Sequence, residues 1–467
     1  MKKLLVTTAV GAVLATVHSA HADEHTFKIG TMATLEGTYT VLGEDGVRGM
    51  KTALAAFGGK VAGKDVELVI QSTDASPDSA VRAARKLVEQ DGLDVIVGPL
   101  SGSEGIAIRD YAKTQPGTTF INGSSGAQET TYVNPSENFF RFNADGAQWS
   151  WGLGSYVYNE KGYETVATIG EDYSFIYTQV FGFALDYCQA GGEITERFWV
   201  PLGTKDFGSI IASLPDDVDA IYLGLGGGDA VNFLNQYQQA GGDANLIGGT
   251  IMVDGTVLNS KGDAKRALIG TPSSGPQADT WDDPAWTTFV KLYQDTFPPD
   301  ERFPAPSLLA TLYYNNMSAT LTCLDEVGAD LSDGHAAFRS CLANLELDSP
   351  VGKITLDENR QAIGATFISE VIEDDNGNLV NQFISMDPGV PQNLRIDPEK
   401  FAALGAPSRE TRRARCRTDL SLKLVRAFAP GPLAEPYLLQ KPCGHDTDQL
   451  PHSGPFRRWR ARGSTAF

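Results

Sequence analysis

Residues 94–113, "DVIVGPLSGSEGIAIRDYAK", show the fold pattern of this chain most clearly. A short apolar run ends at a Gly-Pro corner, and a loop with two serines and two glycines leads into an amphipathic stretch. This order predicts a buried strand, a loop and a helix. The same succession recurs on both sides of it. Strands that alternate with helices predict parallel sheets covered on both faces.

The alternation occurs in two blocks. The first contains "FKIGTMA", "DVELVIQST", "DVIVGPL" and "TTFINGSS", and the second begins after "NFFRFNADGAQWS" with "ETVATIGED", "DAIYLGLGGGD" and "ANLIGGTIMVD". Strands return later in "GKITLDENRQAIGATFISEVIED". A body of about 400 residues suits two lobes of about 150 to 200 residues each. We therefore predict an α/β fold with two doubly wound lobes, whose ligand-facing residues lie in loops after the strands.

The N-terminal segment is typical of an export signal. Lys2 and Lys3 precede a short apolar stretch, and Ala20-His21-Ala22 supplies small residues for cleavage, so residues 1–22 are expected to be removed. No later segment has the roughly 18 uninterrupted apolar residues of a membrane helix. No cysteine follows the cleavage site, so we expect no lipid anchor. The mature protein is predicted to be a periplasmic protein.

Charge divides the chain into two unequal parts. Residues 1–408 carry a net charge of −27, whereas residues 409–467 carry a net charge of +7. The acidic body argues against nucleic acid or an anionic membrane surface as the main partner. The basic segment is rich in Arg and Pro and lacks periodicity, so it is predicted to be disordered. A functional basic tail and an extension that belongs to no fold both remain open.

Patterns for catalysis and cofactor binding are missing. The chain has no P-loop motif, and "GLGGGD" at 224–229 places Asp229 where a dinucleotide-binding motif needs glycine. For Asp229, capping of the next helix is the favoured role, and a position in a cleft-facing loop is the alternative. The spacing around Ser103 does not fit a nucleophile elbow, and the body contains only His25 and His335. We predict no catalytic residues, no metal site and no cofactor, although carboxylate-only catalysis remains open without a marked pair.

Two hydroxyl-rich loops follow neighbouring predicted strands. The candidate residues are Ser101, Gly102 and Ser103 in the first loop and Ser124 and Ser125 in the second. Backbone N–H groups at a helix N-terminus favour negative charge, so the two loops are suited to hold one carboxylate. Alternatively, the first serines cap a helix and the second pair forms a turn. Both interpretations remain open from the residues alone.

The cysteines suggest one structural bridge. Cys323 and Cys341 lie on two predicted helices, "SATLTCLDEVG" and "GHAAFRSCLANL", which are joined by a Gly- and Asp-rich turn. In an oxidising compartment this spacing suits a disulfide that contributes about 3 kcal/mol. Two buried thiols are the alternative. The states of Cys188, Cys416 and Cys443 stay open.

Several motifs, in order, resemble one family. They are "FKIGTMATLEGTYTVLGEDGVRGM", "DVIVGPLSGSEG", "TTFINGSSGAQETT", "FFRFNADGAQ", "GEDYSFIYTQVFGF", "DAIYLGLGGGDAVNFLNQYQQAGG" and "IGGTIMVDGTVL". With the signal peptide, they are similar to the extracytoplasmic solute-binding proteins of branched-chain amino-acid ABC importers, over roughly residues 26–407. The resemblance implies a type I periplasmic binding protein, in which two lobes joined by three crossover segments close on a ligand. The implied lobes are 26–143 with 274–350 and 144–273 with 351–400.

The resemblance also implies site residues. The carboxylate-binding positions would be Ser101, Gly102, Ser103, Ser124, Ser125 and Gly126. Gly126 stands where amino-acid binders usually offer a threonine, which removes one hydroxyl contact. Asp254 resembles the acid that pairs with a ligand ammonium, or it is simply a turn residue. Tyr39, Tyr173 and Phe175 lie in loops that line the side-chain pocket of similar proteins, and together they favour an apolar or aromatic ligand body.

The function that follows is solute capture for transport. The expected protein is a monomer that binds a small carboxylate-bearing solute, such as a branched-chain or other amino acid, and presents it to an inner-membrane ABC permease. Similar proteins also handle aromatic acids, amides or urea, so these stay alternatives for the solute. A ligand-sensing receptor module is a second hypothesis, since the same fold serves sensors. A secreted hydrolase is a third, and the shortage of histidines argues against it.

Overall fold

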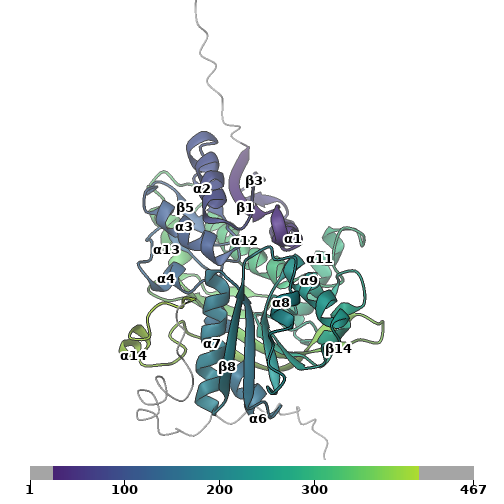
Figure 1. The fold of residues 1–467 in the computed structure, drawn as a ribbon. Coiled ribbons are helices and arrows are strands. Elements are labelled where there is room, and N and C mark those ends of the chain that lie inside the picture. Colours follow the sequence, from purple (N-terminus) through teal and green to yellow (C-terminus); the bar gives the residue numbers. More distant parts are fainter. Residues whose placement is uncertain (1–24, 410–467) are drawn as a thin grey trace, which may run out of the picture. The chain divides into compact units, whose positions relative to one another are not determined.

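The computed structural model describes residues 25–409. The predicted signal peptide at 1–22 lies outside the described residues, as does all of the predicted tail at 409–467 except Arg409. Figure 1 shows the described chain as two sheets with helices around them. No helix within 25–409 combines the length and apolarity needed to cross a membrane.

The first sheet has six strands in the order β2-β3-β1-β4-β5-β6. All neighbours are parallel except the β2–β3 hairpin. The strands are β1 (Thr26–Thr34), β2 (Lys60–Val61), β3 (Lys64–Thr73), β4 (Val95–Val97), β5 (Thr119–Ile121) and β6 (Phe139–Phe140). The helices of this region are α1 (Thr40–Ala56), α2 (Pro77–Arg85), α3 (Gly102–Ala112), α4 (Glu129–Tyr132), α11 (Pro284–Thr296), α12 (Leu308–Glu326) and α13 (Ala336–Asn344). We call this sheet with its helices the first lobe.

Alternating strand residues of the first sheet enter two different cores. Val95 and Val97 pack in the core that contains α1 and α12, whereas Ile96 packs with α2 and α3. Successive side chains of a strand point to opposite faces, so helices must cover both. The apolar run "VIV" is therefore buried throughout, as a doubly wound sheet requires.

The second sheet has nine strands, ordered β12-β13-β14-β11-β10-β9-β7-β8, with β15 paired to β14. Its parallel strands are β7 (Thr165–Glu171), β8 (Glu193–Val200), β9 (Ala220–Gly224), β10 (Asn245–Gly248) and β11 (Pro272–Gly275). Its antiparallel strands are β12 (Leu347–Ser349), β13 (Gly352–Leu356), β14 (Ala362–Glu373) and β15 (Leu379–Val390). Its helices are α5 (Gly146–Trp149), α6 (Leu153–Asn159), α7 (Ser174–Ala190), α8 (Gly208–Ile211), α9 (Gly227–Gln239), α10 (Gly255–Leu258) and α14 (Pro398–Ala402). We call this the second lobe.

The second sheet is also covered on both faces. Tyr222 of β9 packs in the core that contains Phe183 of α7, whereas its neighbours Ile221 and Leu223 pack with Phe233 of α9. The prediction of an α/β fold with two doubly wound lobes is confirmed. The predicted lobe boundaries stay predictions, and β12, which they assign to the first lobe, pairs with β13 of the second sheet.

The segment that leaves the first sheet after β6 runs beside the β13–β14 connection of the second sheet. Arg141, which follows β6, forms a parallel bridge with Gln361, which precedes β14. The Arg141 guanidinium is fully buried, and it donates to the side chains of Gln361 and Thr131 and to the carbonyl of Ala127. A buried guanidinium needs such partners because desolvation would otherwise make it costly. A buried polar network thus fixes the segment around Arg141 to the segment around Gln361.

The predicted disulfide is present. Cys323 of α12 and Cys341 of α13 are bonded, with their Cα atoms 5.6 Å apart and a sequence separation of 18. Asp333, in the turn before α13, accepts hydrogen bonds from the N–H groups of Ala336 and Ala337 and so caps this helix. The helix-turn-helix interpretation of this segment is confirmed.

Candidate functional site

The loop after β7 brings four side chains to the boundary between the lobes. Glu171 ends the buried strand, and Tyr173 is the N-cap of α7 with an extended backbone. Ser174 and Phe175 form the first turn of that helix. The carboxyl ends of parallel strands are where α/β proteins bind ligands, so this loop lies where the sequence analysis expected a site.

A short helical turn of the first lobe contacts this loop. Tyr39 ends η1 (Gly37–Tyr39), and its hydroxyl donates a hydrogen bond to the Glu171 carboxylate. The hydroxyl oxygens of Tyr39 and Tyr173 are 3.0 Å apart, and the two ring centroids are 6.0 Å apart. The rings of Tyr173 and Phe175 follow at 6.1 Å. The structure therefore brings together Tyr39, Tyr173 and Phe175, as the resemblance implied.

Burial controls the electrostatics of this cluster. Burial raises the pKa of the Glu171 carboxyl well above its usual value, and nearby Asp229 raises it further, although the hydrogen bond from Tyr39 opposes the shift. Burial also raises the pKa of the Tyr39 and Tyr173 hydroxyls, and the Glu171 carboxylate adds to both shifts. The closed arrangement therefore favours the protonated forms of all three groups.

In the first predicted anion-binding loop, Ser101 caps a helix and Ser103 contacts the other lobe. Ser101 is the N-cap of α3 in a capping box with Glu104, and its hydroxyl donates to the Ala75 carbonyl at 2.8 Å. Ser103 lies two residues further on, in the first turn of α3, and its hydroxyl is 3.0 Å from that of Ser174 in the second lobe. Gly102 faces Phe175, because an added Cβ would lie 2.8 Å from the Phe175 backbone nitrogen. Ser103 and Gly102 thus face the other lobe, whereas the Ser101 side chain serves its own helix.

The second predicted loop contributes mainly close backbone contact. The Ser124 hydroxyl donates to the Leu100 carbonyl at 3.3 Å, and the Ser125 hydroxyl packs against Gly105. An added Cβ at Gly126 would lie 2.8 Å from Cδ2 of Phe175 and 3.0 Å from Cζ3 of Trp149. Gly126 therefore leaves room for these rings, which a threonine at this position would not. The departure from the family pattern has a steric reason.

Asp254 lies at a different boundary contact. It is the N-cap of α10, and its two oxygens accept from the backbone N–H groups of Thr256 and Leu308, each at 2.9 Å. Burial raises the pKa of its carboxyl to about 6. Its oxygens thus already hold one N–H from each lobe, and the structure does not bring it to Tyr39 or Phe175. It borders a cavity of only about 20 Å³ with Thr250 and other residues.

Two acids of the second lobe, Asp229 and Glu171, accept hydrogen bonds from the first lobe. Asp229 was expected to cap α9, but Gly226 is the N-cap, and Asp229 instead accepts from the Thr38 hydroxyl at 2.7 Å and from the Gly203 N–H at 2.7 Å. The expectation failed because Asp229 lies in the first turn, where it reaches across to the first lobe. Glu171 was not predicted at all. An acid that ends an otherwise apolar strand, as in "TVATIGE", was the available signal.

The glycines of "GLGGGD" lie where the two lobes approach each other closely. Gly227 has a positive φ of 49°, and an added Cβ there would lie 2.4 Å from the Thr38 carbonyl oxygen. Only glycine tolerates both the conformation and the contact. These glycines therefore allow the two lobes to approach closely. This role accounts for a glycine run that lacks the dinucleotide-binding motif.

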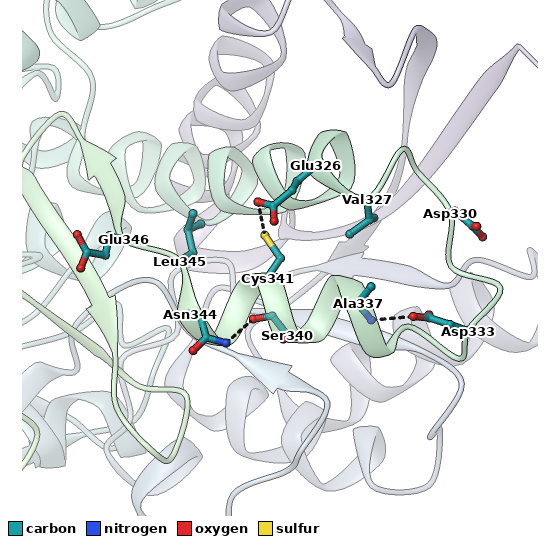
Figure 2. A pocket seen from close by; sticks show the side chains of 10 residues that line it. All are labelled: Glu326, Val327, Asp330, Asp333, Ala337, Ser340, Cys341, Asn344, Leu345 and Glu346. Carbon is teal, nitrogen blue, oxygen red and sulfur yellow. Dashed lines mark hydrogen bonds between the residues drawn. The ribbon is translucent and has the colours of Figure 1, made fainter.

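Figure 2 shows a groove elsewhere on the first lobe. It has a volume of about 660 Å³, lies beside Cys341 between α12 and α13, and is lined by acidic residues such as Glu326 and Asp330. It contains none of the predicted ligand-binding residues. Among residues 25–409, no three His, Cys, Asp or Glu side chains gather as a metal site would require. The interlobe cluster is therefore the better candidate.

Comparisons with known proteins give consistent matches. A family model described as "Periplasmic binding protein" matches residues 26–377. Leu/Ile/Val-binding protein homolog 6 of Brucella melitensis is 23% identical over 399 residues, covering 84% of this chain and 99% of the relative. A solute-binding protein of an ABC transporter from Rhodopseudomonas palustris BisB5, solved with 3,4-dihydroxybenzoic acid, is 26% identical with a TM-score of 0.71, covering 81% of this chain and 100% of that one. A leucine-binding protein of Thermotoga maritima shares the fold, with a TM-score of 0.66, 19% identity, and coverage of 77% and 98%.

Proposed function

The chain belongs to the periplasmic binding protein family, and from this premise we propose that it captures a small carboxylate-bearing solute between its lobes and delivers it to a membrane permease. Its relatives are solute-binding proteins of ABC transporters. The predicted signal peptide is consistent with such a role outside the cytoplasm. Transport rather than sensing is our primary proposal.

The observation that carries this proposal is that three contacts between the lobes converge on loops that follow strands. They are Tyr39 with Glu171, Ser103 with Ser174, and Thr38 with Asp229. These contacts can form only when the lobes are close. A solute that binds better to this closed arrangement than to an open one shifts the population toward it without any covalent step.

Seven of the ten predicted ligand-binding residues have a part in the proposal. The backbone N–H groups of Gly102 and Ser103 at the start of α3 would bind the carboxylate, together with the hydroxyls of Ser103 and Ser124. Ser101 would orient that loop as its cap. Tyr39, Tyr173 and Phe175 would contact the rest of the solute, which supports an apolar or aromatic ligand body.

An aromatic acid is the second candidate solute. The rings of Phe175 and Trp149 pack edge to face, with centroids 5.9 Å apart, over the space where a threonine is absent at Gly126. The similar protein from Rhodopseudomonas palustris BisB5 was solved with an aromatic acid. A ring-lined cleft with one fewer hydroxyl suits such a ligand.

The proposal is tested by a thermal-shift screen followed by calorimetry. The probes are L-leucine, L-phenylalanine, benzoate and 3,4-dihydroxybenzoate, and a ligand at 100 times its dissociation constant stabilises the protein by about 2.7 kcal/mol. A variant with both Ser103→Ala and Ser124→Ala should bind the best probe more than tenfold more weakly. Ser76→Ala removes the cap of α2, outside the site, and serves as the control. No stabilisation by any carboxylate would refute the proposal.

A further inference from the structure

Glu171 is a fully buried carboxyl whose partners come from both lobes. One oxygen accepts from the Gly226 N–H of its own lobe at 3.1 Å. The other accepts from the Tyr39 hydroxyl of the first lobe. The residue has no exposed surface. Its second partner is therefore present only while the lobes are closed.

No positive charge among the described residues compensates this carboxyl. Within residues 25–409 Glu171 forms no ion pair, and the groups that face it are the neutral hydroxyls of Tyr39 and Tyr173 and the acid Asp229. Asp145, another fully buried acid, lies 3.9 Å from the Arg141 guanidinium. Closing the lobes over an ionised Glu171 is unfavourable, because a buried charge needs a partner.

A cation supplied by the solute would resolve this imbalance. An ammonium group carries three donors and one positive charge, and it could take the place of the Tyr39 hydroxyl against Glu171. The rings of Tyr39 and Tyr173 also offer faces that attract a cation. Asp254 is less suited, since both of its oxygens already accept backbone N–H groups.

We propose that Glu171 is the partner of a protonated amine on the solute, so that the solute is an amino acid with its carboxylate directed toward Ser103. This inference rests on the proposed function, because it assumes that the carboxylate binds at α3. It selects amino acids over the aromatic acids that share the same carboxylate. Glu171 ends β7 and Ser174, whose hydroxyl contacts Ser103, begins α7, so the two groups flank one short connection.

The experiment compares matched ligands that differ by the amine alone. The pairs are L-phenylalanine with 3-phenylpropanoate and L-leucine with 4-methylpentanoate, measured by calorimetry on the full chain. The wild type should bind at least one amino acid ten or more times more tightly than its deaminated partner. Glu171→Gln should reduce that ratio to about one, while binding of the deaminated acid is unchanged, since without an ammonium the closed site favours the protonated carboxyl, which the neutral amide resembles.

Two further variants make the result specific. Asp186→Asn neutralises another buried acid of the second lobe, which accepts from the Ser155 N–H, and it should keep the wild-type ratio. Tyr39→Phe removes the hydroxyl that competes for Glu171, and it should keep or increase the ratio. If Glu171→Gln fails to fold, the measurement on Tyr39→Phe tests the proposal. Loss of the preference for the amino acid over its deaminated partner in Tyr39→Phe would overturn the proposal.

The outcomes separate the inference from the proposed function. Equal binding of both members of each pair, or loss of the ratio in Asp254→Asn but not in Glu171→Gln, overturns the role of Glu171 alone. Tight binding of 3,4-dihydroxybenzoate with no binding of amino acids also overturns it, while the carboxylate site stands. If no carboxylate binds, the proposed function fails as well.

Discussion

The loops that meet between the lobes differ in how they use their side chains. In the first lobe the hydroxyls of Ser101 and Ser124 donate to carbonyls of their own lobe. In the second lobe Glu171, Ser174 and Phe175 all contact the opposite lobe. Apart from Tyr39, which reaches Glu171, the first lobe thus presents backbone and small residues, and the second presents the larger side chains. Similar positions in two similar lobes have therefore taken different tasks.

The difference shows that small hydroxyl residues after a strand do not by themselves mark ligand contacts. Such residues satisfy the free N–H groups of the next helix at least as readily as they bind a ligand. A larger side chain such as that of Phe175 must find space, and here that space is created by Gly102 and Gly126 of the other lobe. Complementary size across the boundary is the more specific signal.

The largest effect is expected when size is added to the first lobe. Gly126→Thr would press a side chain into the rings of Phe175 and Trp149. Overpacking costs about 1 to 3 kcal/mol. We expect a lower melting temperature and at least about tenfold weaker binding of the best ligand from the screen, since 1.4 kcal/mol corresponds to a factor of ten. Thermal melts and calorimetry measure both.

A rescue and a control accompany this variant. Phe175→Leu in the Gly126→Thr background should recover part of the melting temperature, because the smaller side chain frees space. Gly117→Ala is the control, since no atom lies within 4 Å of its added Cβ. A fully stable Gly126→Thr protein with unchanged affinity would show that the first lobe does not need to be small here.

Glu104 provides a pH test of the cap in the first lobe. Burial raises the pKa of its carboxyl from 4.5 to about 7. Because the folded-state pKa is the higher one, its contribution to stability is complete below pH 4.5 and is lost as the pH rises through 7. The wild type should lose about 1 to 3 kcal/mol of unfolding free energy between pH 5 and 8 that Glu104→Gln does not lose.

Urea unfolding at both pH values checks this prediction. Glutamine can still serve in the capping box with Ser101, so the helix itself should persist. Ligand affinity should not change in Glu104→Gln, because its carboxyl serves the backbone of its own lobe. A change in affinity without a change in stability would place Glu104 in the ligand site. Side chains of the first-lobe loop would then not serve only their own lobe.

A smaller effect should separate Ser101 from Ser103. Ser101→Ala removes an N-cap, which costs about 1 kcal/mol of stability. Ser103→Ala leaves the cap intact and removes a contact with Ser174. We expect the first variant to melt at a lower temperature with nearly wild-type affinity, and the second to show the reverse. Identical behaviour of both in melts and calorimetry would mean that the loop acts as one unit.

The smallest effect is expected at the edge of the second-lobe loop. Arg409 forms an ion pair with Asp172 at 2.6 Å, and its side chain is 53% exposed. Exposed pairs contribute about 0 to 1 kcal/mol. Arg409→Ala, and deletion of residues 409–467, should each leave affinity and melting temperature nearly unchanged. A fall of many degrees in the deletion alone would show that residues beyond 409 pack on the body.

Much of the fold could be predicted from local pattern. The alternation around residues 94–113 indicates a doubly wound sheet because a strand buried on both faces is apolar throughout, as Val95, Ile96 and Val97 are. The link between Cys323 and Cys341 was predictable because both lie on one helix-turn-helix segment. Both features depend on residues that are close together in the sequence, so they can be recognised from the sequence alone.

The site was only partly predictable, since its contacts are not local. The importance of Tyr39, Tyr173 and Phe175 followed from the resemblance. An acid at the end of a strand was a signal for Glu171, but its pairing with Tyr39, which is 132 residues away, could not be recognised. Asp229 was assigned to a cap for the same reason, because its partner Thr38 is 191 residues away. Residue type alone does not reveal such a partner.

The order of strands and helices, the two-lobe architecture and the family follow from hydrophobic periodicity and local motifs, which are properties of the chain. Which side chains cross between the lobes depends on the tertiary structure. Among residues 25–409 it gives Glu171 neutral partners, and it leaves Gly126 as space for aromatic rings. The physical reason is that burial and charge pairing depend on what the other lobe brings, and each lobe's sequence specifies only its own half.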